Sequence, residues 1–535
     1  MEFVRTPPVQ VVIVGGGFAG IETARQLGLR FKDNPAARVT LVSSENYFLF
    51  QPLLPEVVAC SIETSHIVTS VRHLCRHVQY RWGMVEAFDL RRQQLSLIGA
   101  DTAKPQTLAY DHLILCLGQV VGASSIPGMN EHALPLKTLG DAFQLRNHIL
   151  SRLEEAECTA DEMARRRLLT FTTIGAGFSG VETAGAVNDF VKDVSKYYPQ
   201  AHATGHRSVL IHSGERILGE IDQDLAWFAH RTLERRGMEI RLKTRVKEVT
   251  RGQVVTDDGR AIESSTVIST IGNVPHPLVR RLNLPEERGR ILVDECLRVR
   301  GLPNVWALGD AAAIPDLYNG GICPPTAQYA VREGRHCARN VCAIISGKSP
   351  TPFQYRGRGQ MAVVGKHCGV AQIGAWRLSG LMAWLLWRAV YFLKLPGGRA
   401  RIRVGIDWIL DLLFPRDITK FDVQRTDRLQ RAHFSCGEVI VQQGDEADGF
   451  YLIESGEVEI VKETEGQAPE RLRVCSAGDT FGEVAILNSA PRTATVRCLT
   501  SVDVLKFGRH DFLSMFGGYK AFRSQIQETL DRYTA

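Results

Sequence analysis

A glycine-rich turn near the start of the chain constrains the fold more than any other feature. It lies in the stretch VVIVGGGFAGIETARQL, Val11 to Leu27, where β-branched residues precede the glycines and helix formers follow them. The spacing Gly15-x-Gly17-x-x-Gly20 suits a strand–turn–helix unit that binds a dinucleotide. The first glycine permits the turn, the second lets a pyrophosphate approach the backbone, and the third lets helix and strand pack closely. We therefore predict a Rossmann-like unit here.

The same unit recurs further along the chain, in LLTFTTIGAGFSGVETAGA, Leu168 to Ala186. Gly175, Gly177 and Gly180 reproduce the spacing, and the helix residues after them match those of the first copy. Two copies in matching contexts argue against a chance glycine-rich loop. Two dinucleotide sites on one chain predict one tightly held redox cofactor and one exchangeable donor.

The second strand of each unit ends without the acid that usually binds a ribose diol. In the first unit the strand ends at Ser43, so either Glu45 or a backbone group is expected to bind the ribose. In the second unit His212 occupies this place, either as a cofactor contact or as a polar strand end. The choice between NADH and NADPH therefore stays open.

Other strand ends supply further candidate cofactor contacts. Hydrophobic strands end at Gly118 and at Gly272. The strand VWALGD ends in Asp310, which can bond a ribityl hydroxyl or reach a phosphate through water. We expect Ala311 to Ala313 to open a helix, for which Asp310 would alternatively be the N-cap.

The composition is that of an ordinary globular chain with about three or four domains. It has 535 residues, of which 44% are apolar and 23% charged. The twelve cysteines form no paired framework, which indicates a reducing compartment. The N-terminal segment lacks an apolar core of signal-peptide length, so we expect the chain to start in the cytoplasm. A net charge of +6 says little about partners, and we expect no nucleic acid among them.

The sequence changes character from Ala371 to Lys420. Four of the seven tryptophans fall here, and eight Lys or Arg stand against three Asp. The stretch from Trp376 to Leu395 is apolar nearly all round and is expected to be helical. Arg377 and Arg388 would then share one narrow stripe, because they are close to three helical turns apart.

A second helix is expected to follow, with Arg403, Asp407 and Asp411 on one face and apolar residues over the rest. Wide apolar faces, interfacial tryptophans and basic residues suit helices that lie in a bilayer surface. One alternative is a buried core or dimer interface. The other is a helix that spans the membrane, but Arg388 in the middle of the apolar stretch argues against it. We expect peripheral attachment at the cytoplasmic face of the cell membrane, and a homodimer.

From Arg425 onward, short alternating strands with glycine turns predict a β-barrel or jelly roll. A short helix from Gly482 would offer backbone N–H groups to a phosphate. Glu483 could bond a ribose hydroxyl, and Arg492 could grip the phosphate as a fork. The alternative is a jelly roll that has kept the turn and binds nothing.

Residues from about 9 to 420 resemble the type II NADH:quinone oxidoreductases, single-chain flavoproteins with two dinucleotide-binding folds. The matching features are the two glycine turns, the strand that ends at Asp310, and the run Pro324-Pro325-Thr326-Ala327-Gln328. The resemblance implies FAD at the first turn and Asp310, with Ala327 as a further contact, and NADH at the second turn.

The same resemblance implies two catalytic residues. Glu182 would lie near the nicotinamide, and Gln328 near the flavin at a quinone pocket. The family often has a second glutamine where Arg332 stands, and the usual ribose-binding acids are replaced by Ser43 and His212.

Residues from about 428 to 525 resemble a cyclic nucleotide-binding domain. The resemblance rests on Phe481-Gly482-Glu483 and on Pro491-Arg492-Thr493-Ala494. Thr493 fits either cAMP or cGMP in that family.

The expected architecture is α/β, with two Rossmann-like dinucleotide-binding domains, amphipathic membrane-facing helices and a β jelly-roll cyclic nucleotide-binding domain. The predicted parts are an FAD-binding domain in two pieces (9–125 and 286–370), an NADH-binding domain (126–285), membrane-associating helices (371–420) and a cyclic nucleotide-binding-like domain (425–535).

The expected function is hydride transfer from NAD(P)H to FAD and transfer of two electrons onward to a membrane quinone. Regulation by a cyclic nucleotide through the linker near Pro415–Gln424 is part of this expectation. The chemistry needs neither a metal nor a cysteine. One rival is a sulfide:quinone oxidoreductase that uses Cys158 or Cys323. Another is a ligand-sensing regulatory protein on a degenerate flavoprotein scaffold.

Overall fold

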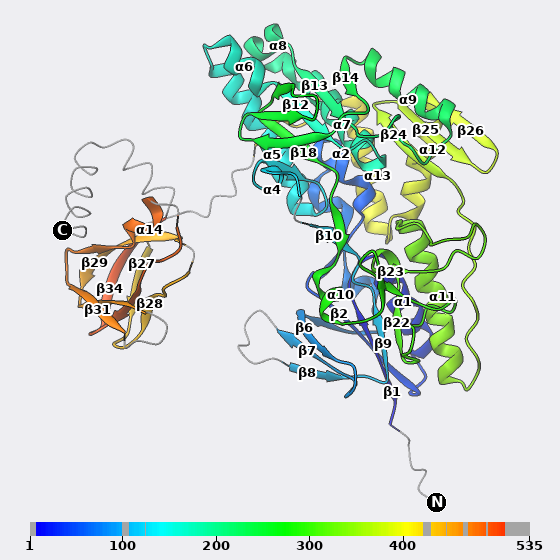
Figure 1. The fold of residues 1–535 in the computed structure, drawn as a ribbon, viewed down its shortest axis with the longest axis horizontal. Helices are drawn as coiled ribbons and strands as arrows, with labels where there is room; N and C mark the ends of the chain where they lie inside the picture. Colours follow the sequence, from blue (N-terminus) through cyan, green and yellow to red (C-terminus); the bar gives the residue numbers. More distant parts are fainter. Residues whose placement is uncertain are drawn as a thin grey trace, which may run out of the picture. The chain divides into compact units, whose positions relative to one another are not determined.

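The computed structural model describes residues 7–98, 106–122, 125–420, 430–445, 447–463, 469–487 and 490–508. The chain forms two compact units that divide between Lys420 and Phe421 (Figure 1). The first unit contains both glycine turns, and the second contains the strands of the predicted jelly roll.

The first glycine turn belongs to a parallel five-stranded sheet with the strand order β22-β9-β1-β2-β5. Helix α1 (Phe18–Phe31) follows the turn and packs along α11 (Ala327–Ile345), as Figure 1 shows. A Cβ on Gly334 would lie 2.6 Å from the Ala19 carbonyl oxygen, so this glycine permits the close approach of the two helices. The strands of this sheet are β1 (Val9–Val14), β2 (Ala37–Ser43), β5 (Gln79–Trp82), β9 (His112–Leu115) and β22 (Val305–Ala307).

The second glycine turn belongs to another parallel five-stranded sheet, ordered β11-β18-β12-β13-β14. Its helices include α7 (Phe178–Val194) and α9 (Gln223–Arg235). The two passages between the sheets, β10 (Gln119–Val121) and β19 (Asn273–Pro275), pair antiparallel. The predicted pair of Rossmann-like sheets is confirmed. The strands are β11 (Ala133–Pro135), β12 (Thr170–Ile174), β13 (Arg207–Ile211), β14 (Met238–Arg241) and β18 (Thr266–Ser269).

Smaller elements connect and cover these sheets. They are β3 (Tyr47–Leu49), α2 (Leu54–Val58), β4 (Val68–Ser70), α3 (Val71–Leu74), β6 (Met84–Asp89), β7 (Gln94–Ile98), β8 (Gln106–Ala109), α4 (Met129–His132), α5 (Leu139–Cys158), α6 (Glu162–Leu168), α8 (Pro199–Thr204), β15 (Val246–Thr250), β16 (Gln253–Thr256), β17 (Ala261–Glu263), α10 (Pro277–Arg281), β20 (Glu286–Glu287), β21 (Arg290–Leu292) and β23 (Ala312–Ala313).

The end of the first unit is an antiparallel sheet followed by two helices. The strands are β24 (Gln360–Gly365), β25 (Cys368–Ile373) and β26 (Trp376–Ser379), and the helices are α12 (Gly380–Lys394) and α13 (Gly398–Leu413).

The predicted helix from Trp376 to Leu395 is therefore wrong in its first turn. Trp376 pairs with Ile373 across a two-residue hairpin turn in which Gly374 adopts φ +58°, and the helix begins only at Gly380. Arg377 lies on a strand and binds Asp222 at 2.8 Å, so it shares no stripe with Arg388.

The expectation of interfacial tryptophans is wrong for three of the four. Trp384, Trp387 and Trp408 are buried, whereas Trp376 is 75% exposed. Arg388 lies between two of the buried rings, 4.0 Å from the centroid of Trp384 and 4.8 Å from that of Trp408. The inner faces of α12 and α13 are therefore part of the core.

The polar face of α13 turns toward the protein. Asp411 is buried and accepts a hydrogen bond from Arg416 at 3.1 Å, and Asp407 pairs with His66 at 2.6 Å. The outward side chains are apolar and exposed: Leu381, Met382, Leu385 and Leu393 of α12, and Ile402, Ile406, Ile409, Leu410, Leu412, Leu413 and Phe414 of α13 and its end. Among the described residues, no helix combines the length and apolarity that crossing a bilayer requires.

The second unit consists of two antiparallel four-stranded sheets, ordered β27-β34-β29-β32 and β28-β33-β30-β31. This arrangement confirms the predicted all-β module. Residues 421–424 of the proposed linker and residues 509–535 lie outside the described ranges. The elements are β27 (Gln430–Phe434), β28 (Val439–Val441), β29 (Gly449–Ser455), β30 (Val458–Lys462), β31 (Glu470–Cys475), β32 (Thr480–Phe481), α14 (Glu483–Leu487), β33 (Thr495–Cys498) and β34 (Val502–Gly508).

Candidate functional site

The first glycine turn has a different requirement at each glycine. Gly15 adopts φ +113°, and a Cβ there would lie 2.1 Å from the Cys116 carbonyl oxygen. A Cβ on Gly20 would lie 1.9 Å from the Gly15 oxygen, so this glycine lets the helix pack against the turn. A Cβ on Gly17 would meet nothing within 4 Å. The surface at Gly17 is therefore open to a ligand, and the geometry fits the pyrophosphate of a dinucleotide.

The second turn repeats this geometry. Gly175 adopts φ +102°, and a Cβ on Gly180 would lie 1.9 Å from its carbonyl oxygen. Gly177 again faces open space, with nothing within 4 Å of an added Cβ. This open approach at the N-terminus of α7 suits the pyrophosphate of a second dinucleotide.

Adjacent strand ends of the first sheet bring other predicted residues to the same edge. The chain leaves β1 at Gly15, β9 shortly before Gly118, and β22 shortly before Asp310. Asp310 lies in a 3₁₀ turn, Gly309–Ala311, that leads into β23. The predicted helix at Ala311–Ala313 is therefore wrong, and with it the N-cap alternative for Asp310. Burial raises the pKa of Asp310, and the charges of Lys137 and Arg290 oppose this shift.

Glu333 of α11 supports this turn and was not identified from the sequence. Its Oε2 accepts a hydrogen bond of 2.8 Å from the Gly309 N–H. Burial is the main cause that raises its pKa to about 7, and Asp310 adds to the shift. The sequence stretch AQYAVREG also contains Gln328 and Arg332, so it offered no clear signal that Glu333 is buried.

The first ribose-binding position has no carboxylate at the strand end. Ser43 ends β2, and its Oγ accepts a 3.3 Å hydrogen bond from the Glu45 N–H. A Cβ on Gly16 would lie 2.5 Å from this hydroxyl, which places Ser43 directly against the glycine turn. Glu45 is exposed, two residues beyond the strand, and its role as a ribose ligand stays a prediction.

His212 occupies the matching place after β13. Its Nδ1 accepts a 3.4 Å hydrogen bond from the N–H of Ala176, inside the second glycine turn. Burial lowers the pKa of His212, which favours the neutral imidazole that can accept this bond. Gly272, between β18 and β19, adopts φ +84°.

Glu182 lies in the first part of α7, where β24 and α12 contact its side chain. Its Oε1 accepts hydrogen bonds of 3.1 Å from the Val363 N–H of β24 and from the Trp387 Nε1 of α12. Burial outweighs these bonds and raises the pKa of Glu182 to about 8. Sequence reasoning did not identify Trp387 as a partner, because the contact joins distant segments.

Gln328 follows Ala327 in the first turn of α11. Its Oε1 accepts hydrogen bonds from the Tyr355 hydroxyl at 2.8 Å and from the Arg358 N–H at 2.7 Å. Its Nε2 donates to the Gly359 carbonyl oxygen at 3.2 Å. These three hydrogen bonds fix the amide of Gln328 and connect the 355–359 segment to the start of α11.

The candidate phosphate site of the second unit lies where β32 meets α14. Arg492 is buried and donates to the Gly482 oxygen at 3.0 Å, the Gly449 oxygen at 2.6 Å and Asp448 Oδ1 at 3.0 Å. Gly482 adopts φ +94°, a conformation that favours glycine, and a Cβ there would lie 2.7 Å from Arg492 Nη1. Glu483 is buried at the start of α14, and Thr493 is exposed.

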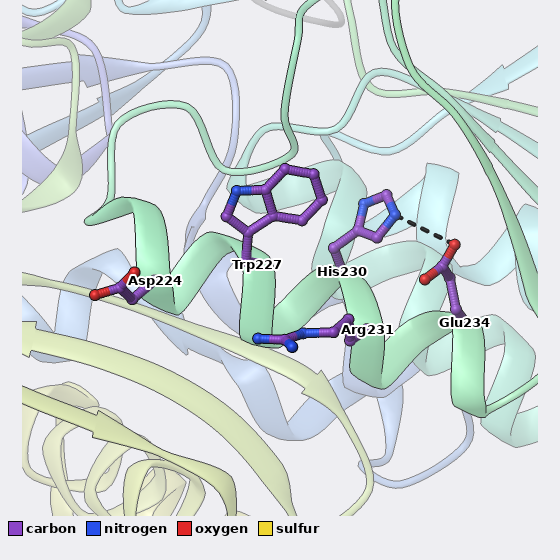
Figure 2. Close-up of a pocket in the computed structure, with 5 residues that line it drawn as sticks. All are labelled: Asp224, Trp227, His230, Arg231 and Glu234. Carbon is purple, nitrogen blue, oxygen red and sulfur yellow. Dashed lines mark ion pairs between the residues drawn. The ribbon is translucent and has the colours of Figure 1, made fainter.

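A further cavity, of about 610 Å³, lies on the outer side of α9. Figure 2 shows that its lining residues rise from one helix, with an ion pair between His230 and Glu234. Asp224, Trp227 and Arg231 complete the lining. None of the predicted site residues contributes to it, so this cavity is separate from the dinucleotide turns.

Of the two cysteines proposed for the sulfide-oxidising alternative, Cys323 does not suit it. Cys323 is buried, and burial raises the pKa of its thiol to about 12, whereas the nucleophile required is a thiolate. Cys158 is exposed at the end of α5.

The sequence matches three known protein families. Residues 9–334 match the pyridine nucleotide-disulphide oxidoreductases, residues 358–417 match the NDH2 C-terminal domain, and residues 431–519 match the cyclic nucleotide-binding domain.

Relatives of known function cover most of the first unit. The type II NADH:quinone oxidoreductase Ndh of Mycobacterium tuberculosis is 32% identical over 76% of this chain and 89% of its own length. The demethylphylloquinone reductase NdbB of Synechocystis is 30% identical over 75% of this chain and 95% of its own length.

Solved structures agree on the fold. NDH2 from Plasmodium falciparum, solved in complex with NADH, superposes with a TM-score of 0.72 at 20% identity, over 77% of this chain and all of that chain. The sulfide:quinone oxidoreductase of Aquifex aeolicus has a TM-score of 0.58 at 16% identity, over 76% of this chain and 96% of that chain, which shows a shared fold alone.

Two dinucleotide turns on parallel sheets, together with these matches, define a two-nucleotide flavoprotein oxidoreductase. The chain belongs to the pyridine nucleotide-disulphide oxidoreductases and, within them, to the type II NADH:quinone oxidoreductases. It is an enzyme that transfers electrons from NAD(P)H through FAD to a quinone. The predicted enzyme class and cofactors are confirmed.

Proposed function

We propose that FAD binds at the first turn, with Asp310 at its ribityl chain, and that NADH binds at the second turn. The observation that carries this assignment is the open approach at Gly17 and at Gly177, while the other glycines of each turn are closed by backbone or side-chain atoms of the protein. FAD would accept the hydride and release electrons to the quinone. The turns position both dinucleotides, and the surrounding core excludes water.

We propose that Glu182 acts near the nicotinamide and that Gln328 acts at the quinone. Glu182 keeps a proton at neutral pH, because burial raises its pKa to about 8, so it is suited to exchange a proton near the nicotinamide and the acceptor. Gln328 presents a fixed amide for a quinone oxygen, supported by its bonds to Tyr355 and Gly359.

A steady-state assay tests this function. The holoenzyme should oxidise NADH only when a short-chain quinone is present. Gln328→Ala should raise the KM for quinone and leave the KM for NADH unchanged. A Gln328→Ala enzyme with unchanged quinone kinetics would remove Gln328 from the acceptor site.

We propose attachment to a membrane surface through the exposed apolar residues of α12 and α13. The acidic side chains Asp407 and Asp411 turn inward, which leaves the outer face apolar. Peripheral attachment brings the acceptor side close to a quinone dissolved in the bilayer. We place the enzyme at the cytoplasmic face of the cell membrane, as a homodimer. Protease accessibility in sealed vesicles of known orientation tests the face, and the mass in detergent solution tests the dimer.

We propose that the second unit binds a cyclic nucleotide and changes the activity of the first. The support is the buried Arg492 beside Gly482 and Glu483, within a matched cyclic nucleotide-binding domain. Calorimetric titration of the full chain with cAMP and cGMP tests this, and millimolar ligand that produces neither heat nor a thermal shift would end the proposal. If the domain binds no nucleotide, a dimerisation role is the remaining candidate.

A further inference from the structure

A cavity of about 320 Å³ lies where α1 and α11 meet the segment before Tyr355. Its volume is within the range of about 300–1,000 Å³ that small-ligand sites occupy. Its charged and amide lining comes from Gln26, Arg332, Arg335, His336, Arg339 and Gln354. The proposed roles of the enzyme leave this cavity without a ligand.

The cavity is strongly basic. Arg332, Arg335 and Arg339 lie on one face of α11, because they are spaced by three and four residues. Arg335 pairs with Glu22, and this carboxylate is shared with Arg25 at 3.0 Å. Within the described ranges, Arg332 and Arg339 form no ion pair with a carboxylate. The pocket therefore has a surplus of guanidinium groups.

Neighbouring groups already orient these two arginines. Arg332 lies over the Tyr355 ring, 5.5 Å from its centroid. Arg339 donates to His336 Nδ1 at 3.1 Å, while His336 Nε2 donates to the Thr351 oxygen at 2.7 Å. The orientation lowers the entropy cost of binding an anion.

Lys394, the last residue of α12, is electrostatically coupled to an arginine of the pocket. Burial lowers the pKa of Lys394, and the charges of Arg332 and Arg358 lower it further.

We propose that this pocket binds a phosphate group, supplied by an anionic lipid headgroup or by a free phosphate anion. Guanidinium forks bind phosphate oxygens in a bidentate way, and they remain charged at every physiological pH. The cavity on α9 does not offer this chemistry, because Asp224 and Glu234 line it. The lipid source rests on the proposed membrane attachment, whereas phosphate binding itself does not.

The test uses the full-length holoenzyme and two double variants. Arg332→Gln/Arg339→Gln removes the two arginines of the pocket that lack a carboxylate partner. Arg231→Gln/Arg235→Gln removes two exposed arginines of α9 and is the charge-matched control. Each protein is titrated with inorganic phosphate in a calorimeter and sedimented with vesicles of phosphatidylcholine, with and without phosphatidylglycerol.

We expect the wild type and the control to bind phosphatidylglycerol vesicles at least about tenfold more tightly than phosphatidylcholine vesicles, and the pocket variant to lose this preference. Loss of phosphate heat in the pocket variant alone would show that the pocket also takes the free anion. Arg339→Glu is a second variant with the same expected loss, for use if the double variant has a lower thermal midpoint.

Two results would overturn the proposal. One is a pocket variant that equals the control in both arms. The other is a wild type that gives no phosphate heat and no preference for phosphatidylglycerol. A wild type that binds neither kind of vesicle would contradict the membrane attachment, and the phosphate titration would then decide on the pocket by itself.

Discussion

Trp387 Nε1 donates a hydrogen bond of 3.1 Å to the Glu182 carboxylate, although 205 residues of chain separate them. The bond joins the helix of the second glycine turn to α12. Helix α12 thus has two roles, because its inner face encloses an ionisable group and its outer face is apolar and exposed. Deleting the residues after Ala371 would remove Trp387 together with the exposed apolar face. Substitutions on that face are therefore a cleaner test of membrane attachment than a truncation.

Glu182→Gln should change the pH dependence of stability. The folded-state pKa of about 8 lies above the ordinary value of 4.5, so the folded protein binds the extra proton between these values. The free energy of unfolding should then fall by up to about 1.4 kcal/mol per pH unit as pH rises through this window. Thermal midpoints from pH 5 to 8 should fall less steeply in Glu182→Gln than in the wild type.

The matched control for this prediction is Trp387→Phe, which keeps the carboxyl group and removes one of its donors. Its stability should keep the downward slope with pH. Equal slopes for the wild type and Glu182→Gln would show that the Glu182 carboxyl does not titrate in this window.

Gly17→Ala should weaken FAD binding without disturbing the turn. An added Cβ meets no protein atom within 4 Å, so the fold tolerates it, while the pyrophosphate approach is obstructed. The flavin content of the purified protein should drop by at least about tenfold. Gly20→Ala is the contrasting variant, because its Cβ would lie 1.9 Å from the Gly15 oxygen and should impair folding. Full flavin content in Gly17→Ala would contradict the assignment.

Gly177→Ala should separate the two dinucleotide sites. It changes the same position of the second turn, where a Cβ also meets nothing within 4 Å. We expect normal flavin content and a KM for NADH that rises by at least about tenfold. Lost flavin with an unchanged KM for NADH would mean that the two turns have been assigned in the wrong order.

His212→Glu should increase the preference for NADH over NADPH. The present imidazole offers no carboxylate to a ribose diol, and it bonds the turn through Ala176. A hydrogen bond to a charged group contributes about 1.5–3 kcal/mol, so the ratio of kcat/KM for the two nucleotides should shift by at least about tenfold. His212→Gln is the neutral control and should leave the ratio near that of the wild type. An unchanged ratio in His212→Glu would place the ribose elsewhere.

Ile409→Glu/Leu413→Glu should detach the enzyme from vesicles while it stays folded. Both side chains are more than half exposed on α13, so the substitution breaks no core contact. Each apolar side chain buried in lipid is worth about 1.5–3 kcal/mol, so vesicle binding should weaken by more than about tenfold. Trp227→Glu changes an exposed apolar residue on α9 and should leave binding unchanged. Equal sedimentation of all three proteins would exclude this surface.

The glycine turns could be predicted because their spacing is visible in the sequence. The contact that requires glycine at position 20 is local, with the Gly15 oxygen, whereas Gly15 itself faces the Cys116 oxygen just after β9, a contact that the sequence does not show. The strand nature of Trp376 could not be predicted from apolar periodicity, since it depends on pairing with Ile373 across a hairpin. Short apolar runs fit a strand and a buried helix equally well.

Helical periodicity also did not show which face of α13 turns inward. It correctly placed Asp407 and Asp411 on one side, but their partners, His66 and Arg416, come from outside the helix. The role of Glu333 could not be predicted for a related reason, because its hydrogen bond from the Gly309 N–H depends on packing between separate segments of the chain.

The most direct test of the central claim is an anaerobic titration of the purified holoenzyme. NADH, and separately NADPH, is added while the flavin absorbance is followed, and a short-chain quinone is added afterwards. We predict rapid bleaching by NADH and recovery of the absorbance on addition of quinone. A flavin that stays oxidised with both nucleotides would contradict the proposed electron transfer from the second glycine turn to the first.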